Sequence, residues 1–86
     1  MKVLIVEDNP NMGAALRDLM RRENYVPDWA RSLEDADIMR SNAAHDLILL
    51  DLSLPDGDGI TFLRGLRAAK DHTPVIVLTA RGGLND

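Results

Sequence analysis

The sequence predicts an α/β domain built on a mostly parallel β-sheet. Two apolar runs, residues 3–6 and 47–50, are each long enough for one strand and contain no polar residue. Uninterrupted runs of this kind are typical of strands buried on both faces, as in parallel sheets. Strand and helix patterns alternate along the whole chain in the order βαβαβαβ. Each helix then serves as the crossover between two parallel strands.

Length and composition indicate one small globular domain. The chain has 86 residues, of which 45% are hydrophobic and 28% charged, and it contains no cysteine. Its net charge is −4, and no run rich in lysine or arginine suggests a nucleic-acid surface. No stretch reaches the roughly 18 apolar residues of a membrane span. We therefore expect a single cytoplasmic domain that binds neither nucleic acid nor membrane and has no thiol chemistry.

The first strand is expected at residues 2–6 and is followed by a helix. Asn9 is a suitable N-cap, and Pro10 suits the first helical position, where an N–H group is not needed. The helix should run to about Glu23. Apolar residues recur at helical spacing and should form one apolar stripe: Met12, Ala15, Leu16, Leu19 and Met20.

Residues 25–30 form a weaker second strand. Pro27 cannot donate a hydrogen bond to a neighbouring strand, so this strand belongs at an edge of the sheet. Ser32 is expected to cap a second helix, with Asp35 three residues later as a variant capping box, and this helix should end near Ala44. Its inward-facing residues should be Leu33, Ala36, Met39 and Ala43.

The second half of the chain repeats the pattern. A third strand at 46–50 is joined by a loop at 53–59 to a helix at about 59–70. Pro74 opens a fourth strand at 75–78. The core stripe of the third helix is expected to contain Ile60, Leu63 and Leu66, with Phe62 beside it.

Three isolated residues have mainly structural interpretations. Trp29 lies at the end of the edge strand and is expected to be a partly buried anchor. His45 and His72 precede the third and fourth strands, and both are expected in surface loops.

Carboxylates follow the two strongest strands. Glu7 and Asp8 come directly after the first strand, and Asp51 follows the third. The carboxyl ends of parallel strands share one edge, where such sheets bind ligands. Because Glu7 and Asp8 are adjacent, we expect their side chains to diverge, so that only one points straight into the cleft. Like charges at this range favour a divalent cation, and hard oxygen ligands suit Mg²⁺.

The same edge has the groups needed for phosphoryl chemistry. A carboxylate such as Asp51 can act as a nucleophile towards phosphorus and form an acyl phosphate. Thr79, at the end of the fourth strand, offers a hydroxyl group that can donate to a phosphoryl oxygen on Asp51. Each of these residues could be an ordinary turn residue by itself. Their conjunction on three strand ends predicts a functional site.

Three segments carry a resemblance to a known family: VLIVEDN (3–9), DLILLDLSLPDGDG (46–59) and PVIVLTAR (74–81). With them the chain resembles the receiver domain of bacterial two-component response regulators, and is most similar to the OmpR/PhoB group. The resemblance implies a flavodoxin-like, CheY-like doubly wound parallel sheet of strand order 2-1-3-4. It also implies that residues 1–86 are a partial receiver domain, truncated before a fifth strand and the last two helices.

The resemblance also implies specific roles. Asp51 would be the phosphoacceptor, phosphorylated by a sensor histidine kinase, and the domain would be a signalling switch rather than an enzyme. Thr79 would be the switch hydroxyl, with the small Ala80 leaving room for it. The groups implied to hold Mg²⁺ are Asp8 and Asp51 directly, the backbone carbonyl of Ser53, and Glu7 through water. The parent protein would be a DNA-binding transcriptional regulator.

The sequence departs from the family at the lysine that completes such sites on a fifth strand, because the sequence ends at Asp86. A bare fourth-strand edge at 75–78 is short, apolar and uncharged, so we expect it to pair with a second copy across a two-fold axis. An alternative function is therefore an interaction or dimerisation module with an incomplete, non-switching acid pocket. A phosphatase of the haloacid dehalogenase type is disfavoured, because it needs an aspartate where Ser53 stands.

Overall fold

The computed structural model describes residues 1–54 and 56–78, with Ser53 described by its backbone alone. Its main sheet consists of the strands β1 (Lys2–Val6), β2 (Val26–Ala30), β3 (Leu47–Asp51) and β6 (Val75–Leu78), in the order β2-β1-β3-β6. Every neighbouring pair is parallel. The predicted fold class, the strand order and the edge position of the strand that contains Pro27 are confirmed.

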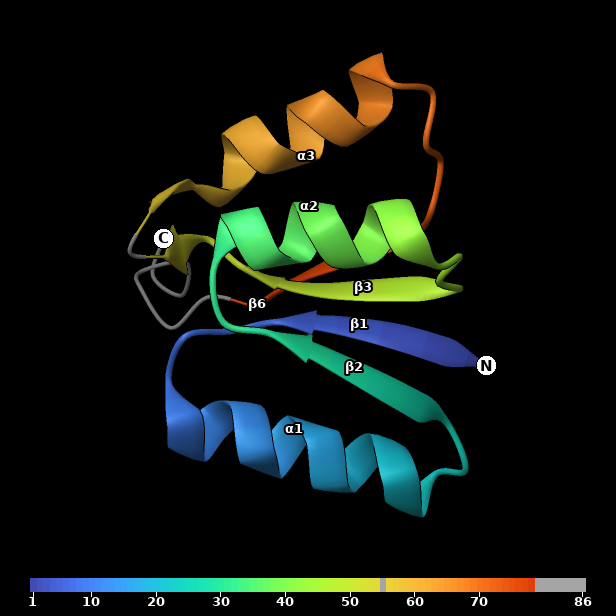
Figure 1. Cartoon of the computed structure of the whole chain (residues 1–86). Coiled ribbons are helices and arrows are strands. Elements are labelled where there is room, and N and C mark those ends of the chain that lie inside the picture. The colour runs from blue at the N-terminus through green and yellow to red at the C-terminus, as the bar shows by residue number, and fades with distance from the viewer. Residues whose placement is uncertain (55, 79–86) are drawn as a thin grey trace.

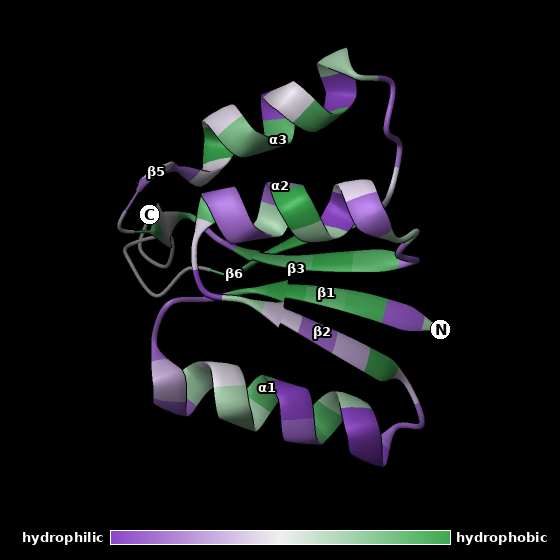
Figure 2. Cartoon of the chain, viewed as in Figure 1, coloured by the Kyte–Doolittle hydropathy of each residue, from purple (hydrophilic) through white to green (hydrophobic). Residues whose placement is uncertain are grey.

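The helices cover both faces of this sheet and make three layers. In Figure 1, α1 (Pro10–Arg22) lies on one face, and α2 (Leu33–Asn42) and α3 (Gly59–Ala68) lie on the other. Successive strand residues point to opposite faces, so strands between two helical layers must be apolar at every position. Figure 2 shows this as hydrophobic colouring along most of β1 and β3, with a hydrophilic residue at the start of β1. The buried strand side chains divide accordingly: Leu4, Val6, Ile48 and Leu50 face α2 and α3, whereas Val3, Ile5 and Leu49 face α1.

Both predicted helix caps are present. The side-chain oxygen of Asn9 accepts from the N–H groups of Asn11 and Met12, at 2.9 and 3.0 Å. The hydroxyl of Ser32 accepts from the N–H of Asp35 at 3.1 Å. These bonds satisfy N–H groups that have no partner within the helix. The starts of α1 and α2 are thus fixed by local sequence.

The apolar stripe predicted for α1 divides between two environments. Leu16 and Met20 pack against the buried cluster under α1. Met12 and Leu19 are instead 51% and 38% exposed to solvent. The predicted helix is present, and within the described residues only part of its apolar stripe packs against the sheet.

The prediction of which α3 residues form the core stripe was wrong at one position. Ile60 is 36% exposed, and the residue that faces the sheet in the first turn is Gly59. A Cβ atom at Gly59 would lie 2.9 Å from the Cα of Leu52, so the helix can approach this closely only with glycine. The inward face follows from Gly59 at helical spacing: Phe62, Leu63 and Leu66.

The segment predicted as a loop after Asp51 contains a short antiparallel pair, β4 (Ser53–Leu54) and β5 (Gly57–Asp58). The carboxylate of Asp56 accepts from the N–H groups of Leu33 and Glu34, at 2.8 and 3.0 Å. These two bonds hold the pKa of Asp56 below its usual range. This segment is therefore attached to the first turn of α2.

The predicted surface position of His45 also differs from the structure. Its side chain is only 1% exposed, and its Nε2 lies 2.8 Å from Oδ2 of Asp28 on β2. The same carboxylate oxygen lies 3.6 Å from Nζ of Lys2. The expectation of a surface position was wrong for His45, because its partner lies 17 residues away in the sequence. His72 is exposed, as expected.

Across residues 1–54 and 56–78, no helix has the length and apolar character needed to cross a membrane.

Candidate functional site

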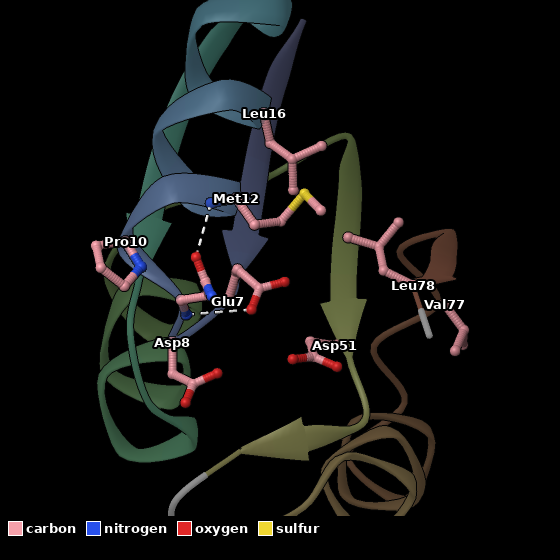
Figure 3. A pocket seen from close by; sticks show the side chains of 9 residues that line it. Glu7, Asp8, Pro10, Met12, Leu16, Asp51, Val77 and Leu78 are labelled. Atoms are coloured by element: carbon pink, nitrogen blue, oxygen red, sulfur yellow. Dashed lines mark hydrogen bonds between the residues drawn. The ribbon is translucent and has the colours of Figure 1, made fainter. Parts of the chain in front are cut away.

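Three carboxylates gather at the carboxyl ends of β1 and β3. Oxygen atoms of Glu7, Asp8 and Asp51 all lie within 4.8 Å of one another (Figure 3). The register of the sheet produces this arrangement, because Val6 is paired with Leu50 and the acidic residues follow on each strand. The expectation that these residues share one edge is confirmed.

The expectation that only one of Glu7 and Asp8 could reach the cleft was wrong. Strand β1 ends at Val6, so the strict alternation of strand side chains no longer applies to the two residues that follow. Both carboxylates offer an oxygen to the same cluster.

The electrostatics of the cluster favour a bound cation. Glu7 is only 6% exposed, and this burial raises the pKa of its carboxyl group. The N–H of Asn9 donates to Glu7 at 3.2 Å and opposes the shift, whereas the charge of Asp51, a hydrogen bond with Asp51 and the charge of Asp8 add to it. Three acidic oxygens this close repel one another unless a positive ion offsets them. Hard carboxylate oxygens are the ligands that Mg²⁺ prefers, so the donor set fits this ion.

The carboxylates form one wall of an open cavity of about 840 Å³. Apolar side chains of α1 and β6 also line the cavity (Figure 3): Met12, Leu16, Val77 and Leu78. The sequence analysis placed Met12 and Leu16 on the apolar stripe of the first helix but did not predict that they line this cavity. Asp51 lines this cavity together with Glu7 and Asp8.

Glu7 and Asp8 form the acidic loop that follows β1. The backbone of this acidic loop is hydrogen-bonded to residues at and just after the end of β2. The N–H of Glu7 donates to the carbonyl of Ala30 at 3.0 Å. The indole Nε1–H of Trp29 donates to the carbonyl of Glu7 at 2.9 Å, and the guanidinium of Arg31 lies 3.4 Å from the carbonyl of Asp8. Trp29 is half-buried, as expected of an anchor. Sequence reasoning missed both hydrogen bonds to the loop, because their partners lie more than 20 residues apart.

The remaining candidate residues follow β3 and β6. Ser53 begins β4 two residues after Asp51, and its carbonyl remains a predicted ligand. Asp51 is paired with Leu78 in the sheet, so the end of β6 lies next to the acidic cluster. Thr79 and Ala80 lie outside the described residues, and their roles remain predictions.

Comparison with known proteins agrees with this geometry. The response regulator receiver domain family matches residues 3–86. The swarming motility regulation protein RssB of Serratia marcescens is 43% identical over 81 residues, covering 94% of this chain and 37% of the relative. The transcriptional regulatory protein PmrA of Pectobacterium parmentieri is 38% identical over 86 residues, covering all of this chain and 39% of the relative.

Solved structures agree as well. The response regulator TrrA of Thermotoga maritima, crystallised in complex with Mg²⁺ and BeF, superposes with a TM-score of 0.89 at 28% identity. The superposition covers 98% of this chain and 73% of that one. Of the curated relatives RssB and PmrA, by contrast, this chain spans less than half the length. On the family match and these identities, the chain belongs to the response regulator receiver domain family.

Proposed function

We propose that the chain is a phosphoacceptor domain of two-component signal transduction, in which Asp51 receives a phosphoryl group from a sensor histidine kinase. The observation that carries this proposal is the cluster of three carboxylates within 4.8 Å on the wall of an open cavity. The parent protein is proposed to be a DNA-binding transcriptional regulator; the relative PmrA is named a transcriptional regulatory protein. The exchange would take place in the cytoplasm.

The proposed transfer uses few groups. A carboxylate oxygen of Asp51 attacks phosphorus, an O–P bond forms, and the N–P bond of the kinase's phosphohistidine breaks. The electron pair of that bond stays on the ring nitrogen, which takes up a proton from solvent to give imidazole. A bound Mg²⁺ would neutralise charge on the phosphoryl oxygens. It would be held by Asp8 and Asp51 directly, by the carbonyl of Ser53, and by Glu7 through water. Thr79 would then donate to a phosphoryl oxygen, with Ala80 leaving it room.

Phosphorylation of Asp51 can be tested by incubating the chain with Mg²⁺ and acetyl phosphate and measuring the intact mass. We expect a gain of one phosphoryl group in the wild type and none in Asp51→Asn. Asp58→Asn is the control, because Asp58 is exposed and lies at the N-cap of α3. Its side chain accepts a hydrogen bond from the N–H of Ile60, and the side-chain oxygen of asparagine can accept the same bond. It should be phosphorylated like the wild type. An unmodified wild type that nevertheless binds Mg²⁺ would contradict the proposal and favour the interaction module.

We also propose that the chain self-associates through β6. Within the described residues, β6 is an edge strand that pairs only with β3. Two of its apolar residues are exposed to solvent, Ile76 by 51% and Val77 by 40%. An exposed apolar edge offers unpaired N–H and C=O groups to a second strand. Pairing of β6 with β6 of a second copy would satisfy them.

This association is expected to give a concentration-dependent dimer by light scattering. Ile76→Lys should shift the chain to the monomer, because a lysine on an edge strand opposes strand pairing. Ile38→Lys is the matched control, since Ile38 has 52% exposure but lies on α2. A wild type that is monomeric at every concentration, or an equal effect of both variants, would contradict this interface.

A further inference from the structure

We propose that Trp29 is a positioning residue that presets the acidic loop for its cation. This inference rests on the proposed function of the carboxylate cluster and adds a residue to it. Trp29 lies on β2, away from the cluster, and acts through the backbone of Glu7.

The indole ring is held on several sides. Its Nε1–H donates to the carbonyl of Glu7 at 2.9 Å. One edge of the ring occupies the space that a side chain at Gly13 of α1 would fill. The guanidinium groups of Arg17 and Arg31 lie 5.6 and 5.7 Å from the ring centre, within range of a cation–π interaction. The position of the indole N–H is therefore well defined.

This hydrogen bond fixes the peptide planes that direct the carboxylates. The N–H of Glu7 is already bonded to Ala30 of β2, and the carbonyl of Asp8 is approached by Arg31. With the carbonyl of Glu7 bonded to Trp29, consecutive backbone groups of the loop face β2. Figure 3 shows the side chains of Glu7 and Asp8 directed towards Asp51.

Holding the acidic loop in place should raise its affinity for the cation. When all three carboxyl groups within 4.8 Å are ionised and no cation is bound, they repel one another, and an unrestrained loop could move Glu7 and Asp8 away from Asp51. A loop that is held in place has less freedom to lose when the ion binds, so the affinity is higher. Groups that orient metal ligands through hydrogen bonds commonly contribute in this way.

The hydrogen bond can be separated from the packing of the ring. Trp29 also packs against the buried cluster under α1, so a loss of stability alone would not distinguish the two roles. Trp29→Phe keeps an aromatic ring and the net charge but removes the donor. Met20→Ala is the control, because Met20 packs against the same cluster and has no bond to the acidic loop.

Mg²⁺ affinity should be measured by isothermal titration calorimetry well below the unfolding temperature, with stability followed by urea unfolding. We expect Trp29→Phe to weaken Mg²⁺ binding by about tenfold. Met20→Ala should lower stability and leave the affinity unchanged. Unchanged affinity in Trp29→Phe would overturn the inference while leaving the proposed function intact. A wild type that does not bind Mg²⁺ would overturn both.

A second measurement on the wild type decides the matter if Trp29→Phe does not fold. The chain has one tryptophan, so its indole N–H gives a single side-chain signal in a ¹H–¹⁵N spectrum. We expect that signal to exchange slowly with solvent and to shift on Mg²⁺ addition with the same saturation as the amides of Glu7 and Asp8. An indole signal that does not respond while those amides saturate would overturn the inference.

Discussion

Gly13→Ala is expected to lower the free energy of unfolding by about 2 kcal/mol, although alanine is the better helix former. The intrinsic preference for alanine over glycine inside a helix is about 1 kcal/mol. At this position a Cβ atom would overlap the indole ring of Trp29, with Nε1 only 2.6 Å away. Overpacking of this kind costs about 1–3 kcal/mol. The ring is also bonded to Glu7, so its movement loses that hydrogen bond too.

Gly65→Ala is the matched control. Gly65 also lies inside a helix, α3, but among the described residues nothing outside the backbone of that helix lies within 4 Å of a Cβ built there. Only the helix preference remains, so this variant should gain up to about 1 kcal/mol. Thermal unfolding measures both, and a loss of 2 kcal/mol corresponds to a fall of roughly 10 °C in Tm for a domain of this size. Gly13→Ala variants as stable as Gly65→Ala would show that the ring moves freely.

Glu7→Gln should have opposite effects with and without Mg²⁺. Glu7 is 6% exposed, and without the ion glutamine removes its negative charge from beside Asp8 and Asp51, so stability should rise by about 1 kcal/mol at pH values above the raised pKa of Glu7. With the ion, the wild type gains about 2.7 kcal/mol at a Mg²⁺ concentration 100 times its Kd. The variant should gain less, because it has lost a charge that attracts the cation.

The pH dependence of this difference follows from the raised pKa of Glu7, which burial causes. The folded chain holds the Glu7 proton to higher pH than the unfolded chain does. Glu7 therefore contributes stability below its unfolded pKa and loses it as pH rises through the raised folded pKa. The apo advantage of Glu7→Gln should accordingly be absent in acid and develop as pH increases.

Urea unfolding at several pH values, with and without Mg²⁺, tests both parts of this prediction. Glu34→Gln is the control for net charge, because Glu34 is exposed in the first turn of α2. It should show neither the apo gain nor the altered response to Mg²⁺. Equal behaviour of the two variants would contradict a specific role for Glu7.

Local sequence predicted much of the fold and the gathering of the acidic residues. The apolar runs of β1 and β3, the cap at Asn9 and the edge strand with Pro27 depend on neighbouring residues, and all were confirmed. The acidic cluster followed from one topological rule, because residues after parallel strands share an edge. These features need no knowledge of how distant side chains pack.

The features that the sequence did not predict depend on contacts between distant segments. The burial of His45 requires Asp28 on another strand, and the loop contact of Trp29 requires the carbonyl of Glu7. The inward face of α3 is set by the close approach of Gly59 to Leu52. Periodicity alone gave the spacing of that helix but not its rotation about its axis. Tertiary packing decided each case.

The bonds from Asp56 to the first turn of α2 join two parts of the chain that would otherwise open independently. Local unfolding usually involves contiguous cooperative units, and the units here are linked across the sequence. Opening of the β4–β5 segment deprives Leu33 and Glu34 of their hydrogen-bond acceptor, so the start of α2 frays with it. We therefore expect the segment that follows Asp51 and the first turn of α2 to open together.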